Sequence, residues 1–381
     1  MILLTVNTGS TSVKLTAFDT VGCGEAEPPP QRVAAQHLDG HAAEPAQALR
    51  AFLRRLDTPP AAVAHRVVHG GTRFTGPTLL DDATRQALAG LSELAPLHNP
   101  VALRWIDAAR QICAGAVQVA AFDTAFFSAL PAVAAEYALP PDLGIELGVR
   151  RYGFHGLAHE AMWRRWCELE PAPAGGGRLI TFQLGGGCSV AALDRGQPRD
   201  TSMGFSPLEG LVMATRSGDL DAAVVPYLER RLGLGGEQVL NLLNERCGLA
   251  GVAGGPGDPR ALLESGAQRG RRAVELYCYR ARKYLGAYLA VLGGCDGIAF
   301  GGGVGEHVPQ VRAGILSGLE WAGVELDRAA NEAARGAEAL VSPAASRVRV
   351  RVIQVDEELL MVRAALTVAK LTSNPTSRTL P

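Results

Sequence analysis

Two stretches of this chain repeat one pattern, and the repeat limits the possible folds more than any other feature. Residues 2–19 (ILLTVNTGSTSVKLTAFD) and residues 179–196 (LITFQLGGGCSVAALDRG) each predict a strand, a glycine turn and a second strand. A duplicated two-lobe fold produces such a repeat, and two glycine turns facing each other across a cleft can hold a polyphosphate through backbone N–H groups. Two unrelated hairpins would give the same pattern, but a third glycine cluster at residues 299–307 (AFGGGVGEH) favours duplication.

The first turn, NTGSTSVK at residues 7–14, has features that suit an anion. Gly9 permits backbone geometry that bulkier residues resist, three hydroxyl residues follow it, and Lys14 adds a positive charge. The spacing differs from that of a P-loop, and the residues after it alternate like a strand. Taken alone, an ordinary hairpin turn would have the same composition.

Length, charge and cysteine usage narrow the class of protein. The 381 residues suggest two domains, and a net charge of −1 does not mark a nucleic-acid or membrane-surface binder. Seven scattered cysteines without a C-x-x-C pair argue against a disulfide framework or zinc site, and fit a cytoplasmic protein. The opening MILLTV is too short for a signal peptide, and no apolar run is long enough to span a membrane. We expect this opening to be a buried strand.

Apolar patterns along the chain predict an α/β protein. Strand-like runs include AAVAHRVVH, AVQVAAFD, LITFQL, GIAFGGG and RVRVRVIQV. Helical spacing occurs between them, in DDATRQALAGLSELA, HEAMWRRWCELE, DAAVVPYLERRLG and RRAVELYCYRARKYLGAYLAVLGG.

Eight motifs resemble those of acetate kinases and their short-chain acyl kinase relatives. In chain order they are NTGSTSVK, HRVVHGG, LHNP, FDTAF, RRYGFHG, TSMGFSPLEGLVMATRSGDLD, FGGGVGEH and VIQVDEELLMVR. The resemblance implies a duplicated two-lobe, actin-like (ribonuclease H-like) ATPase fold with mixed sheets and an interlobe cleft. It implies an N-terminal lobe of residues 1–127 plus 359–381, a second lobe of residues 128–358, and a homodimer joined through the second lobe.

The reaction that this resemblance implies is reversible transfer of the γ-phosphate of ATP to the carboxylate of acetate, or of propionate, by direct in-line displacement. A carboxylate is ionised near neutral pH and needs no general base, so catalysis consists of positioning and charge. Arg66 and Arg216 match family arginines that clamp the carboxylate and the phosphoryl group, and His155 matches a histidine that donates to that group. Asp123 matches a carboxylate that positions Mg²⁺. Outside these motifs, we would interpret the two arginines as ion-paired, the histidine as an ordinary hydrogen-bonded residue and the aspartate as a helix cap.

The resemblance assigns further residues by function. The residues expected to contact or support the phosphates are Asn7, Ser10, Ser12, Lys14, His98, Gly185, Gly186 and Gly187. Those expected to bind or position the metal are Asn7, Asp123 and Glu357. Nucleotide binding falls to Asp258, Arg260, Gly303, Val304, Gly305 and His307, where small residues leave room for a purine and favour ATP over pyrophosphate. An acetate-sized acyl pocket falls to Val68, Leu97, Phe154 and Pro207.

The second glycine loop departs from the family pattern. Acetate kinases read H-L-G-N-G-[SA]-S where this chain has QLGGGCS, so Gln183 and Gly186 replace a histidine and an asparagine. The altered loop resembles the triple-glycine loop of heat-shock ATPases. Two alternatives therefore stay open: a nucleotide-driven conformational protein, which would not need both arginines and an acyl pocket, and a weakened acyl-kinase relative that binds nucleotide or regulates.

Overall fold

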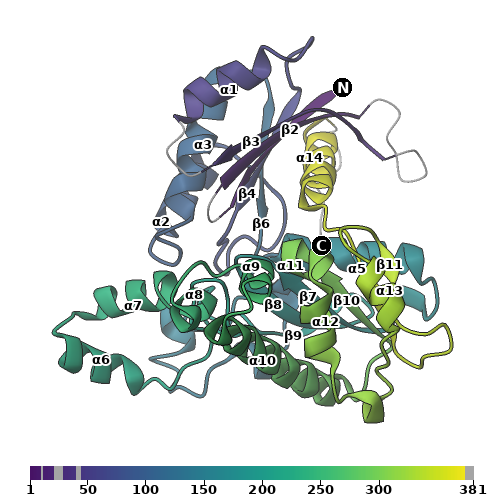
Figure 1. Cartoon of the computed structure of the whole chain (residues 1–381). Coiled ribbons are helices and arrows are strands. Elements are labelled where there is room, and N and C mark those ends of the chain that lie inside the picture. The colour runs from purple at the N-terminus through teal and green to yellow at the C-terminus, as the bar shows by residue number, and fades with distance from the viewer. Residues whose placement is uncertain (10–11, 21–28, 40–43, 374–381) are drawn as a thin grey trace. The chain divides into compact units, whose positions relative to one another are not determined.

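The computed structural model describes residues 1–9, 12–20, 29–39 and 44–373, and these form two units (Figure 1). Unit 1 comprises Met1–Ser128 together with the chain from Asp356 onward, and unit 2 comprises Ala129–Val355. From the sequence we placed the divisions after residues 127 and 358.

Unit 1 is built on a six-stranded mixed sheet in the order β3-β2-β1-β4-β6-β5. β1 pairs antiparallel with β2 and parallel with β4, and β4 pairs parallel with β6. The elements are β1 (Ile2–Thr8), β2 (Ser12–Asp19), β3 (Gln31–Asp39), α1 (Pro45–Leu53), β4 (Ala62–Val67), β5 (Thr78–Leu79), α2 (Asp82–Gly90), α3 (Asn99–Ile112), β6 (Val117–Phe122) and α14 (Glu357–Ser373).

Helices cover both faces of the unit 1 sheet. α3 packs on one face with α1, while α14, drawn in yellow, packs against β1, β4 and β6 on the other (Figure 1). On the α3 face, Leu4, Val6 and Val63 of the sheet pack with Phe52 and Trp105 in one buried cluster. Burial of these large apolar side chains fixes the sheet whose carboxyl edge carries candidate site residues.

Unit 2 repeats this topology strand for strand. Its sheet has the order β9-β8-β7-β10-β12-β11, and its pairings have the same sense as those in unit 1. The strands are β7 (Arg178–Leu184), β8 (Cys188–Asp194), β9 (Gln197–Thr201), β10 (Gly297–Gly301), β11 (Ala339–Leu340) and β12 (Arg349–Val352). The helices are α4 (Ala132–Ala135), α5 (Gly156–Leu169), α6 (Val224–Leu232), α7 (Gly236–Glu245), α8 (Gly248–Ala253), α9 (Pro259–Glu264), α10 (Gln268–Leu292), α11 (Gly302–His307), α12 (Pro309–Leu316) and α13 (Arg328–Ala333). The expected duplicated α/β fold is therefore confirmed.

The two faces of the unit 2 sheet are covered by α10 and α5. Neighbouring residues of β8 contact opposite helices, as strand alternation requires. The Cys188 thiol lies 3.1 Å from the Tyr277 hydroxyl of α10, whereas the Ser189 hydroxyl lies 2.8 Å from His159 of α5.

Several elements differ in extent from the sequence expectation. β3 was not expected, because its side chains are exposed or half-buried and its apolar content is low. RVRVRVIQV forms a strand only over Arg349–Val352, and α2 ends at Gly90 rather than continuing through residue 95. The GIAFGGG strand ends at Gly301, because Gly302 has a φ of +76° and opens α11. No helix among the described residues is long and apolar enough to cross a membrane.

His65, in the middle of the unit 1 sheet, is buried and neutral. Its side chain is 1% exposed, and its Nε2 lies 2.9 Å from Gln118 Oε1. Nδ1 has no hydrogen-bond partner within the described part of the chain. Burial lowers the pKa of His65 to about 4, although the Gln118 contact opposes this shift.

We expect His65 to make folding stability depend on pH. Below the ordinary pKa of 6.5, the unfolded chain takes up a proton at this residue, while the folded protein does not until about pH 4. Stability from the neutral form is therefore complete above pH 6.5 and is lost as the pH falls, by about 2 kcal/mol at pH 5. Urea unfolding of wild type and His65→Leu from pH 7.5 to 5 measures this, and equal pH slopes in the two proteins would contradict it.

Candidate active site

Three strands of unit 1 end at one edge of the sheet and bring polar residues together there. Asn7 lies near the end of β1, Arg66 near the end of β4, and Asp123 directly after β6. Because parallel strands share a carboxyl edge, these three side chains meet. Glu357, the first residue of α14, joins them.

Arg66 is the centre of this cluster. Its Nε and Nη2 donate to Asp123 Oδ1 and Oδ2 at 2.9 and 2.6 Å, and its Nη1 donates to Asn7 Oδ1 at 3.2 Å. Asn7 Nδ2 in turn donates to Glu357 Oε2 at 3.0 Å. Burial opposes the charge of Arg66, but Asp123 and Glu357 outweigh it and raise the pKa of Arg66. The guanidinium is therefore a fixed, permanent cation at the sheet edge.

The other predicted residues of unit 1 lie on β2, after β4 and before α3. Ser12 begins β2 half-buried, and Lys14 is exposed, paired in register with Asn7. Val68 is buried, whereas Leu97 is 51% exposed. His98 directly precedes α3 and is half-buried. Ser10 lies outside the described residues.

The oxygen donors of unit 1 fit a magnesium ion carried by a nucleotide rather than one held by a protein cage. No group of three or more His, Cys, Asp or Glu among the residues described here is arranged to hold a metal ion. Asp123 and Glu357 offer two carboxylates beside the Asn7 amide. Mg²⁺ in phosphoryl-transfer sites is held in this way, by one or two carboxylates together with water and substrate phosphates.

The glycine turn between β7 and β8 is the centre of the candidate site in unit 2. Gly185 N donates to Gly187 O at 3.1 Å, and Gly186 is exposed while its carbonyl accepts from Ala214 N at 3.1 Å. A Cβ atom on Gly187 would lie 3.5 Å from both His155 Nε2 and Arg216 Nη1. Two predicted catalytic side chains therefore lie against the same glycine.

Arg216 is a half-buried cation that has no carboxylate partner among the described residues. Its Nη1 donates to Pro207 O at 3.4 Å and approaches the Met213 sulfur at 3.9 Å. Among the residues that the structure describes, no Asp or Glu forms an ion pair with it. Burial therefore lowers the pKa of Arg216, although Cys188 opposes this shift. Such a cation favours an anionic ligand.

His155 directly precedes α5 in an uncommon backbone conformation. Its φ is +58°, which a non-glycine residue adopts only when its surroundings impose it. Its Nδ1 lies 2.9 Å from Ser189 Oγ, so the ring is held from β8 and its Nε2 edge lies beside Gly187. Sequence reasoning did not single out Ser189. The i, i+4 spacing of His155 and His159 was a signal that one partner on the sheet could contact both rings.

The predicted nucleotide residues fall on α9 and α11. Asp258 caps α9 by accepting from Arg260 N and Ala261 N at 2.8 and 3.0 Å, and Arg260 is exposed. Beside it, Gly257 packs so closely against the carbonyl of Ala214 that a Cβ atom would not fit, so this loop touches the residue whose N–H binds the glycine turn.

In α11, Gly303 is exposed and Val304 and Gly305 are buried, and His307 is exposed where the helix ends against Gly336. Sequence reasoning also missed Arg312. This fully buried side chain donates to the carbonyls of Gly305 and Glu306 at 2.7 and 3.2 Å and so fixes the end of α11.

The acyl-pocket residues of unit 2 are Phe154 and Pro207. Phe154 is 1% exposed, next to His155. Pro207 is half-buried, and its carbonyl accepts from Arg216.

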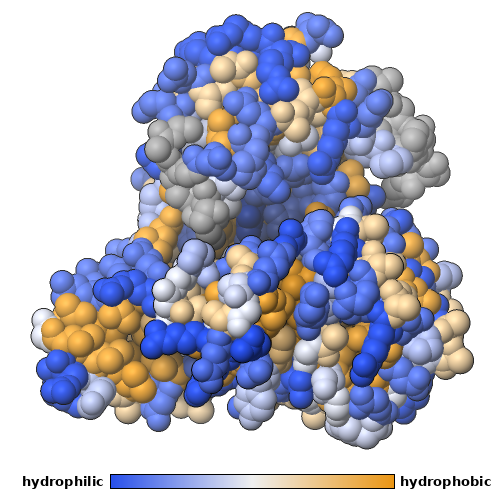
Figure 2. Space-filling view, viewed as in Figure 1, coloured by the Kyte–Doolittle hydropathy of each residue, from blue (hydrophilic) through white to orange (hydrophobic). Residues whose placement is uncertain are grey.

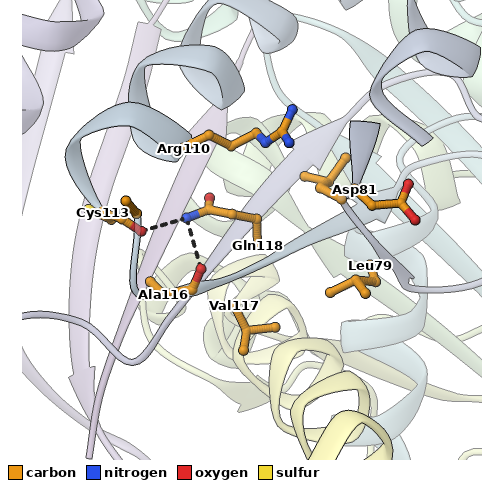
Figure 3. Close-up of a pocket in the computed structure, with 9 residues that line it drawn as sticks. Leu79, Asp81, Arg110, Cys113, Ala116, Val117 and Gln118 are labelled. Atoms are coloured by element: carbon orange, nitrogen blue, oxygen red, sulfur yellow. Dashed lines mark hydrogen bonds between the residues drawn. The ribbon is translucent and has the colours of Figure 1, made fainter. Parts of the chain in front are cut away.

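A cavity of about 340 Å³ lies elsewhere in unit 1, where β5, β6 and the end of α3 meet (Figure 3). Figure 3 shows Gln118 Nε2 donating to the carbonyls of Cys113 and Ala116, each at 3.4 Å. Asp81 and Arg110 lie at its rim. None of the predicted site residues lines this cavity, so it is separate from the sheet edge described above.

In this duplicated α/β fold, a fixed arginine lies beside carboxylates in unit 1 and another lies beside a glycine turn in unit 2, which are the kinds of group that phosphotransferases use. The model of the acetokinase family matches residues 2–363. The acetate kinase of Bacteroides thetaiotaomicron is 43% identical over 312 residues, which cover 81% of this chain and 78% of that protein. The acetate kinase of Solibacter usitatus is 46% identical over 307 residues, or 79% of this chain and 74% of that protein.

Solved structures agree with this class. The crystal structure of Porphyromonas gingivalis acetate kinase matches with a TM-score of 0.85 and 33% identity, covering 97% of this chain and 99% of that one. A propionate kinase from Francisella tularensis also matches with a TM-score of 0.85, at 30% identity, covering 95% of this chain and 98% of that one. The chain belongs to the acetokinase family, and it is an ATP-dependent acyl kinase.

Proposed function

We propose that this chain transfers the γ-phosphoryl group of ATP directly to the carboxylate of acetate, giving acetyl phosphate and ADP, and that the reaction is reversible. Propionate would also be accepted. The observation that carries this proposal is Arg216, a half-buried guanidinium without an ion pair in the described part of the chain, beside a glycine turn and His155 Nε2. A site of this kind stabilises the negative charge that develops on a transferring phosphoryl group.

The two units carry different parts of the proposed reaction. In unit 1, Arg66 is oriented by Asp123 so that its Nη1 edge, near Asn7, can meet the acid's carboxylate. In unit 2, Arg216 Nη1 and His155 Nε2 donate to the phosphoryl oxygens, while Gly185, Gly186 and Gly187 let the backbone approach the phosphates. Ser12, Lys14 and His98 would support the phosphates from unit 1.

The remaining predicted residues shape the substrate sites. Val68, Leu97, Phe154 and Pro207 would surround the acyl methyl group. Asp258, Arg260, Gly303, Val304, Gly305 and His307 would bind the nucleoside.

Mg²⁺ would be held by Asp123 and Glu357, directly or through water, with Asn7 beside them. When bound, the ion neutralises charge on the β- and γ-phosphates. The chain's own contribution is to hold these oxygens in place, since Arg66 fixes Asp123 and Asn7 fixes Glu357.

A homodimer is supported by an unusual helix in unit 2. No residue of α6 is buried, although the helix has one apolar side; Tyr227 and Leu232 are 56% and 51% exposed, and Leu240 of the neighbouring α7 is 48% exposed. Figure 2 shows apolar surface gathered over this region. We propose that a second copy of the chain covers it. The free cysteines, among them Cys167 and Cys247, support placing the protein in the reducing cytoplasm.

The experiment that tests the proposed function measures acyl phosphate, trapped with hydroxylamine, from ATP, Mg²⁺ and each of four acids. The value of kcat/KM for propionate should equal that for acetate or be about tenfold lower, and the value for butyrate should be lower still. One methylene in an apolar pocket is worth about 1–3 kcal/mol. The value of kcat/KM for formate should be lower than that for acetate, because formate has no methyl group to fill the pocket. No product from any acid would contradict the proposal and favour a nucleotide-binding or regulatory relative.

A further inference from the structure

A continuous chain of buried hydrogen bonds runs behind His155. Thr181 Oγ1 lies 2.7 Å from His159 Nδ1, and His159 Nε2 lies 2.8 Å from Ser189 Oγ. Ser189 Oγ lies 2.9 Å from His155 Nδ1. Thr181, His159 and Ser189 are each 0% exposed, so bulk solvent does not reach these side chains.

The Thr181 hydroxyl determines which atom is the donor at each of these hydrogen bonds. Within the part of the chain that the structure describes, His159 Nδ1 is its one hydrogen-bond partner. A buried O–H that donates to nothing is strongly disfavoured, so Thr181 donates and His159 Nδ1 accepts. Burial holds the pKa of His159 well below its usual range, and a positive charge on His155 would lower it further. His159 is therefore neutral and carries its single proton on Nε2.

The same reasoning assigns the donor at the next two contacts. His159 Nε2–H donates to Ser189 Oγ, which leaves the Ser189 hydroxyl proton to donate to His155 Nδ1. An accepting Nδ1 means that neutral His155 carries its proton on Nε2. That nitrogen lies beside Gly187, on the same side as Arg216 Nη1.

We propose that Thr181, His159 and Ser189 are positioning residues that fix the proton of His155 on Nε2, so that His155 always presents an N–H donor beside Arg216. The inference rests on the proposed function only for the identity of the acceptor, a transferring phosphoryl group. Without these hydrogen bonds, the neutral His155 ring would populate both tautomers. The tautomer protonated on Nδ1 would present the Nε2 lone pair to an anion.

The test combines nitrogen-15 NMR of histidine side chains with kinetics on the full-length protein. Loss of the His155 signal in a His155→Gln variant assigns that residue. In wild type, the spectrum should show His155 protonated on Nε2. Ser189→Ala should broaden or shift this signal toward the other tautomer and lower kcat about tenfold, while KM for ATP and for acetate stays near the wild-type value, since one hydrogen bond is worth about 1.4 kcal/mol.

Control variants separate this role from a merely structural one. Thr181→Val should act in the same direction as Ser189→Ala, and Thr181→Ser, which keeps the hydroxyl, should restore both the tautomer and kcat. Ser202→Ala removes another buried hydroxyl of this region, one that accepts from Val190 N at 3.0 Å, and should change neither.

A wild-type His155 protonated on Nδ1, or a Ser189→Ala variant with unchanged kcat, would overturn the inference. If wild type formed no acyl phosphate but His155 carried its proton on Nε2, the proposed function would fail while the tautomer assignment would stand.

Discussion

Arg216→Ala is expected to lower kcat for acyl phosphate formation about a thousandfold without destabilising the protein. Loss of one donor aimed at developing charge lowers kcat by about 10²–10³, and loss of an arginine that stabilises a transferring phosphoryl group by about 10³–10⁵. Stability should hold because Arg216 has no ion pair in the described residues and burial already disfavours its charge. Hydroxylamine trapping and thermal unfolding measure the two quantities.

Two variants accompany this measurement. Arg216→Lys keeps the charge but not the planar fork, so it should recover only part of the lost rate. Arg199→Ala removes an arginine that is 44% exposed and paired with Asp194 at the surface, and should leave kcat unchanged. An Arg216→Ala enzyme within tenfold of wild type would show that this guanidinium does not act on the phosphoryl group.

Asp123→Asn is expected to lower both stability and activity. Asp123 is 1% exposed and holds Arg66 through two hydrogen bonds, so the variant leaves the buried Arg66 charge with only the more distant Glu357 carboxylate, 3.7 Å from Nη1, at about 3 kcal/mol. With Arg66 no longer oriented, kcat should fall about a hundredfold. Urea unfolding and acyl phosphate assays check these values.

The surface pair Arg85–Asp107 is a matched control for this pair. Its Nε–Oδ1 and Nη2–Oδ2 distances are also 2.9 and 2.6 Å, but its side chains are 35% and 39% exposed. Asp107→Asn should therefore change stability by less than about 1 kcal/mol and should not alter kcat.

A double variant, Arg66→Met with Asp123→Leu, shows whether the pair exists for the fold or for the reaction. Replacing both buried charges by apolar groups is often nearly neutral, so this protein should be more stable than Asp123→Leu alone. It should still make no acyl phosphate. Measurable turnover by the double variant would mean that the Arg66–Asp123 pair is structural only.

The repeated strand-turn-strand pattern, together with the third glycine cluster, favoured the duplicated fold, because glycine turns and apolar strands depend on local sequence. Arg66 and Asp123 were predicted from the resemblance to acetate kinases. Both follow predicted strands, and they meet in the structure because parallel strands share an edge. The position of Asn7 beside Arg66 follows from the pairing of β1 with β4.

Other features depend on contacts that single-sequence patterns do not encode. The roles of Thr181 and Ser189 follow from the way α5 packs on β7 and β8, which no periodicity specifies. Likewise, Asp258 has the local signature of a helix cap, and its two backbone hydrogen bonds show that it is one; a further role toward nucleotide stays a prediction. Leu97 was expected in the acyl pocket; it is 51% exposed, and its role there stays a prediction.

The most direct test of the central claim follows the oxygen atoms of the acid. The enzyme is given ATP, Mg²⁺ and acetate labelled with oxygen-18 in its carboxylate, and the acyl phosphate is examined by phosphorus-31 NMR. If the carboxylate attacks the γ-phosphorus, the product carries one labelled oxygen bridging carbon and phosphorus, which shifts the phosphorus signal. A product without label on phosphorus, or no acyl phosphate at all, would contradict direct transfer.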